Sequence, residues 1–490
     1  MCREWFISGQ LLEPYEFAKA DYRQYPAFSV PYHPPAYPVM LGIVFLITGI
    51  SYVWARMFVA ACFGLGACFL FGIGRRLDAS PLGAFVSSLL LLTTPELARW
   101  SRTTMSEVPG LLFITVASYL FLSWVENGHA RLSWLAFGTA GVAFLCRVTT
   151  AGVMPAWFLY LILTKRWPHL RSLHLWVPAG LYLAAGAAWT RFAAAFSKYE
   201  IGLELPTSTT KRLSWNACQY YLTELPEMMG LGLALVVFVL ILAAVYRKVD
   251  RIICFGFCWF VSNFLFVIAV NDHAENRYFS FALVGLLIMS AFPFAERFRQ
   301  GKLGRFILVF SLLAVVGNAA LLLRIPDGLV GHQQVAQKLA DLPRPGNVLL
   351  ACPWESDLIF RYRAERPHTD REMLRGDRTL AIRLYAGYGI EPEYFATDTS
   401  DVLDILQKGR VRYLVTVVDD LRSFRVITPE MTLAHETVLS LPKMFAKRGE
   451  FLMRRDARAR YELYVWEYLG QLPQGPSEIR VKIPTADLDL

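Results

Sequence analysis

Long apolar segments constrain this chain more than any other feature of its sequence. About ten of them approach the roughly 20 residues that an α-helix needs to cross the hydrocarbon layer of a bilayer. Hydrophobic residues make up 55% of the chain and charged residues 18%, where a soluble domain has about a quarter charged. We therefore predict a polytopic α-helical membrane protein with about ten transmembrane helices. The candidate spans are residues 55–74, 82–96, 106–125, 131–147, 148–164, 175–196, 227–246, 252–270, 279–295 and 306–323.

The last third of the chain has a different pattern. Short β-rich stretches such as NVLLAC (347–352) and RYLVTV (412–417) alternate there with helix-like ones, which is typical of a soluble α/β domain. We expect a transmembrane domain over residues 1–325 and a C-terminal soluble α/β domain over residues 326–490. Acidic residues follow two apparent strands, in WESD (354–357) and VVDDL (417–421), and they either bind a ligand or lie in solvated loops.

The distribution of basic residues predicts which loops face the cytoplasm. Short cytoplasmic loops collect Lys and Arg, and here every second loop is basic; a surface for anionic lipids is also compatible with these loops and needs no separate site. The alternate loops then face outward: ARWSRTTMSE (98–107), residues 197–226, NDHAENRYFS (271–280) and the C-terminal domain. We expect a multi-pass protein of the plasma (inner) membrane with an extracytoplasmic C-terminal domain. The basic loops contain Arg75 and Arg76; Lys165, Arg166 and Arg171; Arg247, Lys248 and Arg251; and Arg297, Arg299, Lys302 and Arg305.

The stretch YHPPAYP (32–38) is predicted to lie on the outer side, just before a short apolar segment. We interpret residues 37–51 as a juxtamembrane or re-entrant helix. The prolines fix the backbone and keep the stretch out of that helix, which holds His33 at the outer interface. The alternative is that the prolines merely precede a helix and the tyrosines are interfacial aromatics. These residues are Pro34, Pro35 and Pro38, with Tyr32 and Tyr37.

The segment RWSRTTMSEVPG (99–110) places Arg102 and Glu107 at the outer end of a predicted span. Charges at the end of a membrane helix are costly enough to indicate a functional site. Glu107 follows the capping-type residue Ser106, so it could instead complement the helix N-terminus. We keep both interpretations.

The loop NDHAENRYFS (271–280) concentrates polar side chains directly before another apolar span. An arginine fork recognises phosphate well, and an outer arginine is unexpected in the distribution described above. A site for an anionic head group is therefore the favoured interpretation. Arg147 is a weaker candidate of the same type that could equally be paired structurally. The candidates in the loop are His273, Glu275, Arg277 and Tyr278, with Asp272 beside them.

Several function classes lack sequence support. The chain has no GxxxxGK[ST] motif and no GxGxxG motif after a strand, so a nucleotide-dependent enzyme is not favoured. Its eight cysteines form no CxxC pair and no cluster with histidine, which supports neither a disulfide framework nor a zinc site. We expect no cofactor, no metal and no nucleic-acid partner.

The order of the motifs resembles that of the membrane glycosyltransferases of the GT-C class. YHPPAYP, WARMFVAACFGLGACFLFGIGRRL, TTPELARWSRTTMSE and ENRY follow one another over about residues 1–325. The chain is most similar to the protein O-mannosyltransferases and lipid A aminoarabinose transferases, described as a dolichyl-phosphate-mannose-protein mannosyltransferase family. This resemblance implies transfer of a sugar from a polyprenyl-phosphate donor to a lipid, protein or glycan acceptor at the outer membrane face.

The resemblance also implies roles for the polar residues. A carboxylate must accept the proton of the acceptor hydroxyl, and cationic or hydrogen-bonding groups must stabilise the departing phosphate. Glu107 is the implied catalytic residue. The implied substrate-binding residues are His33, Arg102, His273, Glu275, Arg277 and Tyr278.

One departure from the family pattern concerns the start of the chain. The family begins with a transmembrane helix followed by an acidic general base in the first outer loop, and REWFISGQLLEP (3–14) is preceded by neither. We expect that this sequence begins downstream of the first helix and of the acidic residue, because the chain start is placed too late or the gene is truncated. Two other functions stay open: a transporter or lipid flippase, for which the expected internal repeats are not evident, and a catalytically silent scaffold. Substitute acids that match poorly are Glu4, Glu13, Glu16 and Asp21.

Overall fold

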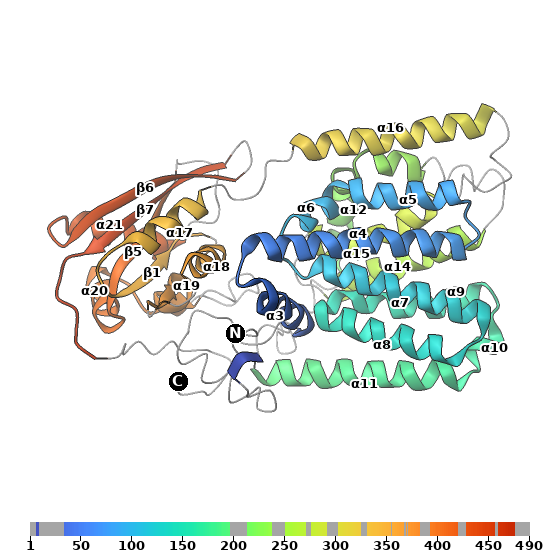
Figure 1. The fold of residues 1–490 in the computed structure, drawn as a ribbon, viewed down its shortest axis with the longest axis horizontal. Coiled ribbons are helices and arrows are strands. Elements are labelled where there is room, and N and C mark those ends of the chain that lie inside the picture. The colour runs from blue at the N-terminus through green and yellow to red at the C-terminus, as the bar shows by residue number, and fades with distance from the viewer. Residues whose placement is uncertain are drawn as a thin grey trace.

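The chain folds as a helical bundle followed by a sheet with its own helices (Figure 1). Buried apolar side chains join most helices of the bundle in one core, which includes Phe121, Trp157 and Trp259. The computed structural model describes residues 6–8, 34–196, 213–237, 250–270, 276–291, 302–324, 331–353, 355–366, 369, 371–382, 393–419, 428–455 and 459–475.

Most helices of the bundle follow the apolar segments of the sequence, but residues 215–226, expected in an outward loop, are helical. The helices of the bundle are α3 (Ala36–Thr48), α4 (Tyr52–Arg76), α5 (Pro81–Thr93), α6 (Pro95–Ser101), α7 (Glu107–Asn127), α8 (Ala130–Cys146), the 3-10 helix η1 (Val148–Gly152), α9 (Val153–Leu163), α10 (Trp167–Leu170), α11 (Leu173–Phe196), α12 (Trp215–Met229), α14 (Arg251–Val270), α15 (Asn276–Met289) and α16 (Lys302–Arg324).

The described helices support a membrane protein but not the predicted count of crossings. Among the described residues, three helices are long and apolar enough to span a bilayer: α4, α7 and α14. The pair α5 and α6 would make a fourth if it formed one span. Shorter apolar helices, including α8 and α15, occupy other predicted spans. About ten crossings are therefore not confirmed.

Two predicted spans are interrupted. The span 82–96 bends by 64° between α5 and α6, because Pro95 cannot continue the helix and Thr94 before it is extended. The span 227–246 begins inside α12, which ends at Met229 before Gly230 with a positive φ of 58°. A second helical segment follows at residues 231–237.

The prediction that the prolines of YHPPAYP stay outside the helix is wrong for Pro38. Helix α3 starts at Ala36, with Pro35 as its N-cap, so Pro38 lies in the first turn. Proline is tolerated there because the first N–H groups of a helix have no intrahelical acceptor. The expected short helix at residues 37–51 is α3, which ends at Thr48.

An ionic network ties together one end of the bundle. The Arg251 guanidinium lies 2.9 Å from the Asp78 carboxylate and 3.2 Å from Glu126. Arg76 also contacts Glu126, at 2.9 Å. Basic residues from two of the loops that were predicted to share a side, Arg76 and Arg251, thus meet at the same end of the bundle.

The strands expected at 347–352 and 412–417 belong to one mixed sheet of five strands in the order β2-β1-β5-β7-β6. β1 (Asn347–Ala351) pairs in parallel with β2 (Met373–Arg375) and β5 (Val411–Asp419). β7 (Ala459–Tyr468) is antiparallel to β5 and to β6 (Phe445–Arg455). The boundary predicted near residue 325 falls outside the described residues.

Helices cover both faces of this sheet. One core joins the sheet to α17 (His332–Asp341) and α18 (Glu355–Glu365), and a second core joins it to α20 (Thr399–Lys408) and α21 (Pro429–Ser440). The short helix α19 (Gly376–Thr379) follows β2, and β3 (Ala381–Ile382) pairs with β4 (Glu393–Tyr394). We call residues 331–475 of this arrangement the C-terminal unit.

Candidate active site

The structure brings together some of the predicted site residues and not others. Glu107 and Tyr278 meet around Arg147, and Arg277 contacts Tyr278. Arg102 contacts α16. His33, His273 and Glu275 fall outside the described residues.

Glu107 is the first residue of α7, and its side chain is only 3% exposed. Its Oε1 lies 3.2 Å from Nη2 of Arg147. Arg147 follows the last residue of α8 in an extended conformation, before η1 begins. A cation thus lies next to a carboxylate that little water can reach.

Gly110 makes this close approach possible. A Cβ atom at Gly110 would lie 3.2 Å from Cγ2 of Thr150 and 3.4 Å from Cβ of Arg147. Both distances are short for carbon contacts. The glycine one turn after Glu107 therefore lets the α8–η1 junction pack against the start of α7.

Two guanidinium groups lie close to the Tyr278 ring. Cζ of Arg147 is 5.1 Å from the ring centroid and Cζ of Arg277 is 4.9 Å from it, within the range of cation–π attraction. Nη2 of Arg277 also donates a hydrogen bond of 3.0 Å to the Tyr278 hydroxyl. Two cations and the Glu107 carboxylate therefore gather around one phenol ring, an arrangement suited to binding an anion.

Helix α12 supports the start of α15, where Tyr278 lies. The Tyr220 hydroxyl donates to Oδ1 of Asn276 at 2.8 Å, and Nδ2 of Asn276 donates to Glu224 at 3.3 Å. Tyr221 stacks on Phe279 with ring centroids 4.9 Å apart. Sequence reasoning missed these supporting residues, although Asn276 belongs to the ENRY stretch that was singled out.

Helix α3 is tied to the segment that precedes Glu107. The Tyr37 hydroxyl donates a hydrogen bond of 2.6 Å to the Thr104 carbonyl. The Tyr37 ring, which is 8% exposed, stacks on Phe58 of α4 at 6.5 Å. Tyr37 of YHPPAYP is thus a packed and hydrogen-bonded side chain.

Arg102 contacts a different helix. Its Nη2 donates to the Leu322 carbonyl at 3.4 Å, in the last turn of α16. A cation at a helix C-terminus complements the helix dipole. The geometry gives Arg102 a role in holding α16.

The acidic residues of WESD lie in the first turn of α18 and not in a loop. Glu355 begins α18 and is buried, where it accepts hydrogen bonds from the Gly376 amide at 2.9 Å and from Nε of Arg375 at 3.2 Å. Burial raises the pKa of Glu355 well above its usual value. Asp357 pairs with His332 and Arg361.

The first part of the bundle matches a known family. Residues 32–190 match the family model described as dolichyl-phosphate-mannose-protein mannosyltransferase. The predicted resemblance is confirmed. The matched residues include Glu107 and Arg147, whereas Arg277 and Tyr278 lie beyond them. No curated protein matches this chain.

The fold is shared with solved membrane glycosyltransferases. ArnT from Cupriavidus metallidurans bound to undecaprenyl phosphate superposes with a TM-score of 0.58 at 14% identity, over 88% of this chain and 87% of that one. Its apo state gives 0.58 at 15% identity, over 94% and 91%. The oligosaccharyltransferase AglB from Archaeoglobus fulgidus, in complex with an inhibitory peptide and a dolichol-phosphate, gives 0.51 at 12% identity, over 89% and 67%. At these identities the likeness shows the fold.

Proposed function

We propose that this chain is a membrane glycosyltransferase that moves a sugar from a polyprenyl-phosphate donor to an acceptor. The observation that supports this most is the Glu107–Arg147 pair beside Tyr278 and Arg277. It lies at one end of a fold shared with ArnT, a protein solved with undecaprenyl phosphate. The reaction is assigned to the outer face of the plasma (inner) membrane, with the C-terminal unit extracytoplasmic.

In the proposed reaction, the acceptor hydroxyl attacks the anomeric carbon of the donor sugar. The bond from that carbon to the phosphate oxygen breaks, and polyprenyl phosphate leaves as an anion. Glu107 accepts the hydroxyl proton as general base. Arg277 and Arg147 stabilise the charge of the leaving phosphate, and Tyr278 holds both guanidinium groups in place.

The other predicted binding residues keep a narrower role in this proposal. His33, His273 and Glu275 are assigned to the sugar or phosphate because they neighbour Tyr37, Asn276 and Arg277 in the sequence. Arg102 is assigned to positioning the segment before Glu107, given its contact with α16. The acceptor is a lipid, a protein or a glycan.

The proposal is tested by measuring the transfer or release of labelled sugar from synthetic polyprenyl-phosphate donors by the purified chain in detergent. Glu107→Gln is expected to lower kcat by about a hundredfold or more, since it removes the base. Arg277→Gln is expected to raise KM for the donor. Arg76→Gln, at the opposite end of the bundle, is the control and should keep wild-type rates. Absence of both transfer and donor hydrolysis across several sugars would favour a transporter or a silent scaffold.

A further inference from the structure

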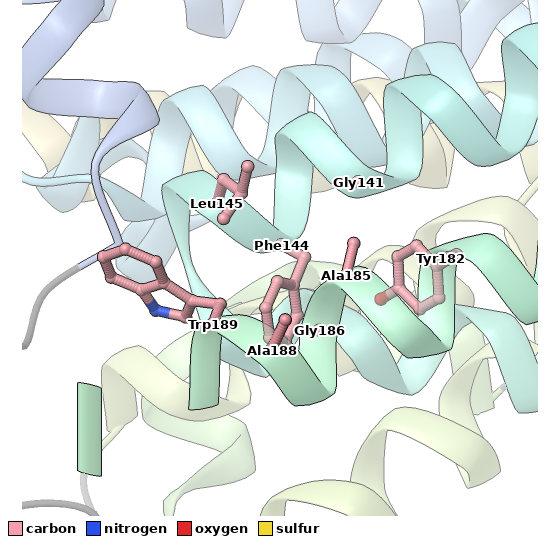
Figure 2. Close-up of a pocket in the computed structure, with 8 residues that line it drawn as sticks. All are labelled: Gly141, Phe144, Leu145, Tyr182, Ala185, Gly186, Ala188 and Trp189. Carbon is pink, nitrogen blue, oxygen red and sulfur yellow. The ribbon is translucent and has the colours of Figure 1, made fainter. Parts of the chain in front are cut away.

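Outside the candidate active site, the bundle and the C-terminal unit present different surfaces. The bundle has an apolar groove of about 500 Å³ between α8 and α11, lined by Gly141, Phe144, Tyr182 and Trp189 among others. None of the lining side chains drawn in Figure 2 is charged. The C-terminal unit instead leaves part of its sheet open where aromatic rings and cations lie together.

Two aromatic side chains of β7 lie on the sheet face that α20 and α21 cover. Successive side chains of a strand alternate between faces, so Tyr464 and Trp466 share one face, opposite Thr416 and Leu414 of β5. Helix α21 packs against β5, but both rings remain only half-buried. The ring centroids are 6.0 Å apart, with an interplanar angle of 23°. We call Tyr464 and Trp466 the aromatic platform.

A chain of hydrogen bonds holds the aromatic platform in place. Nε1 of Trp466 donates to Oγ1 of Thr416 at 3.0 Å. The Thr416 hydroxyl keeps its own hydrogen for Nδ1 of His435, 2.9 Å away. His435 then carries its proton on Nε2, and burial lowers the pKa of His435, so the ring is neutral at pH 7. This N–H group has no partner in the described part of the chain and lies beside both rings of the platform.

Lys447 of β6 adds a cation to the aromatic platform. It pairs across the strands with Trp466, and its Nζ lies 4.4 Å from the centroid of the Tyr464 ring. Lys447 also forms an ion pair with Glu450, but the two side chains are 42% and 50% exposed. Such an exposed pair contributes little in water, so the ammonium group can exchange this partner for an anionic ligand.

Two arginines at the start of β5 carry charge that no carboxylate neutralises. Arg412 lies on the same face as Thr416, and Arg410 directly precedes the strand. Arg412 donates to the Tyr468 carbonyl at 2.6 Å, and Arg410 donates to the Gly475 carbonyl. Within the described ranges neither guanidinium forms an ion pair. Neutral carbonyls leave the positive charge in place, so this end of the sheet attracts anions.

The start of β5 is remote from the bilayer. In Figure 1, α18 lies beside the bundle, whereas α20, which leads into Arg410 and β5, lies on the far side of the C-terminal unit. The candidate spans α4 and α7 run along the line from the bundle to this unit. The far side is therefore turned away from the bilayer, and an anion bound there belongs to a molecule that extends beyond the lipid headgroups.

We propose that this face of the C-terminal unit binds an anionic glycan. The weakly positive C–H groups on one face of a sugar ring pack on the negative faces of Tyr464 and Trp466. Sugar hydroxyls accept from Nε2 of His435. Carboxylate or phosphate groups of the glycan pair with Lys447 and Arg412.

Two carboxylates give the bound glycan a direction. Glu450 pairs with Tyr464 across the strands, and Glu462 accepts a hydrogen bond from the Tyr464 hydroxyl. They repel acidic groups from the Tyr464 end of the platform, so these groups lie at the Trp466 end, near the start of β5. The inference goes beyond the proposed transfer, because the site binds the glycan whether or not that glycan is the acceptor.

The test titrates the full chain, in uncharged detergent, with two anionic probes by isothermal titration calorimetry. Hexagalacturonate supplies carboxylates on sugar rings, and a phosphomannan oligosaccharide supplies phosphates. We expect at least one of them to bind, with an affinity that falls at least about fivefold between about 50 and about 500 mM NaCl. The neutral methyl ester of hexagalacturonate should bind at least about tenfold more weakly than the better anionic probe.

Variants of Trp466 separate stacking from a structural role. Trp466→Ala should weaken the better probe at least about tenfold, because it removes half of the aromatic platform. Trp466→Phe keeps a ring but loses the hydrogen bond to Thr416, and it should weaken binding less than about threefold. Equal losses for the two variants would mean that Trp466 only supports the fold.

A charge variant keeps the test independent of how Trp466→Ala folds. Lys447→Gln, at an exposed position, should weaken the better probe about three- to fivefold and reduce its salt dependence. Lys338→Gln removes the same charge from α17, on the opposite face of the sheet, and is the matched control. It should change the affinity less than about twofold. Equal effects of Lys447→Gln and Lys338→Gln would exclude this face as the site.

Other outcomes would also overturn the proposal. Hexaglutamate carries carboxylates without sugar rings, so binding as tight as that of hexagalacturonate would assign the surface to acidic peptides. Absence of binding by both anionic glycans would exclude the site. Failure of the proposed transfer looks different, because a chain that transfers no sugar would still bind the glycan without any donor.

Discussion

At the residue scale, the candidate site contains a buried ion pair between Glu107 and Arg147. Both side chains are removed from most water, with 3% and 13% of their surface exposed. Such a pair contributes little net stability, because desolvation offsets the attraction, but breaking it leaves an uncompensated charge. The pair therefore constrains which substitutions the bundle tolerates.

Replacing one residue of the Glu107–Arg147 pair should lower the free energy of unfolding more than replacing both. Arg147→Gln leaves Glu107 buried without its cation, and we expect a loss of about 3–5 kcal/mol in the free energy of unfolding. The double variant Glu107→Gln/Arg147→Gln should lose clearly less. Chemical denaturation in detergent measures both values. Additive losses would mean that the two side chains do not interact.

In the C-terminal unit, Asp357 should make stability depend on acidity. Burial opposes its ionisation, but hydrogen bonds from His332 at 2.8 Å and Arg361 at 2.7 Å outweigh that effect and lower its pKa. A pKa that is lower in the folded state stabilises the fold above about pH 4. This stabilisation is lost as the pH falls through the folded-state pKa of Asp357.

Asp357→Asn is therefore expected to lower Tm at pH 7 and to approach the wild-type Tm near pH 3. Thermal unfolding followed by intrinsic fluorescence between these pH values provides the measurement. Asp404→Asn, which removes an exposed partner of Lys408, is the control and should change Tm little at any pH. A Tm difference for Asp357→Asn that is constant with pH would contradict the prediction.

At the element scale, breaks in the apolar helices are held by specific hydrogen bonds. Asn318 of α16 is fully buried and bridges the break after α12. Its Oδ1 accepts from the Leu231 amide at 2.8 Å, and its Nδ2 donates to the Met229 carbonyl at 3.0 Å. One amide side chain therefore satisfies the two backbone groups that flank Gly230.

Asn318→Ala should destabilise the bundle by about 2–5 kcal/mol, because it leaves two backbone polar groups without partners and opens a cavity. The loss is measured as a shift in the chemical unfolding midpoint in detergent. Leu313→Ala, at an exposed position of the same helix, is the control and should shift the midpoint much less. Equal shifts would show that the bridge contributes nothing beyond packing.

At the scale of the whole molecule, helix α18 joins the C-terminal unit to the bundle. Phe360 packs against Phe45 of α3 at 6.0 Å and Tyr52 of α4 at 5.5 Å. The guanidinium of Arg361 lies 4.5 Å from the Tyr52 ring centroid, and that of Arg56 lies at the same distance. This contact and the Tyr37–Thr104 hydrogen bond both involve α3, so the position of the C-terminal unit is linked to the segment before Glu107.

Loss of this contact should loosen the two parts without unfolding either. Phe360→Ala is expected to broaden the distance distribution between spin labels on α18 and α4, measured by pulsed electron paramagnetic resonance. The thermal transition of each part should persist. Leu439→Ala, an exposed position on α21, serves as the control. An unchanged distribution for Phe360→Ala would mean that other contacts hold the parts together.

The sequence by itself determined the class of the protein, the apolar segments that form most of its helices, and the polar stretches near their ends. Apolar runs near spanning length leave a chain few alternatives, because a backbone in lipid must satisfy its own hydrogen bonds. Local sequence patterns also predicted the strands at 347–352 and 412–417. Glu107, Arg277 and Tyr278 were found for the same reason, since polar side chains at the ends of apolar helices stand out in a sequence.

Only the tertiary structure decided which of these residues meet. Glu107 and Arg147 are 40 positions apart, and Arg147 had no sequence signal that separated a functional role from a structural one. The break at Gly230, the role of Asn318 and the groove beside Gly141 arise where helices pack against each other. Contacts of this kind depend on side chains distant in the chain, so no local pattern of spacing or polarity encodes them.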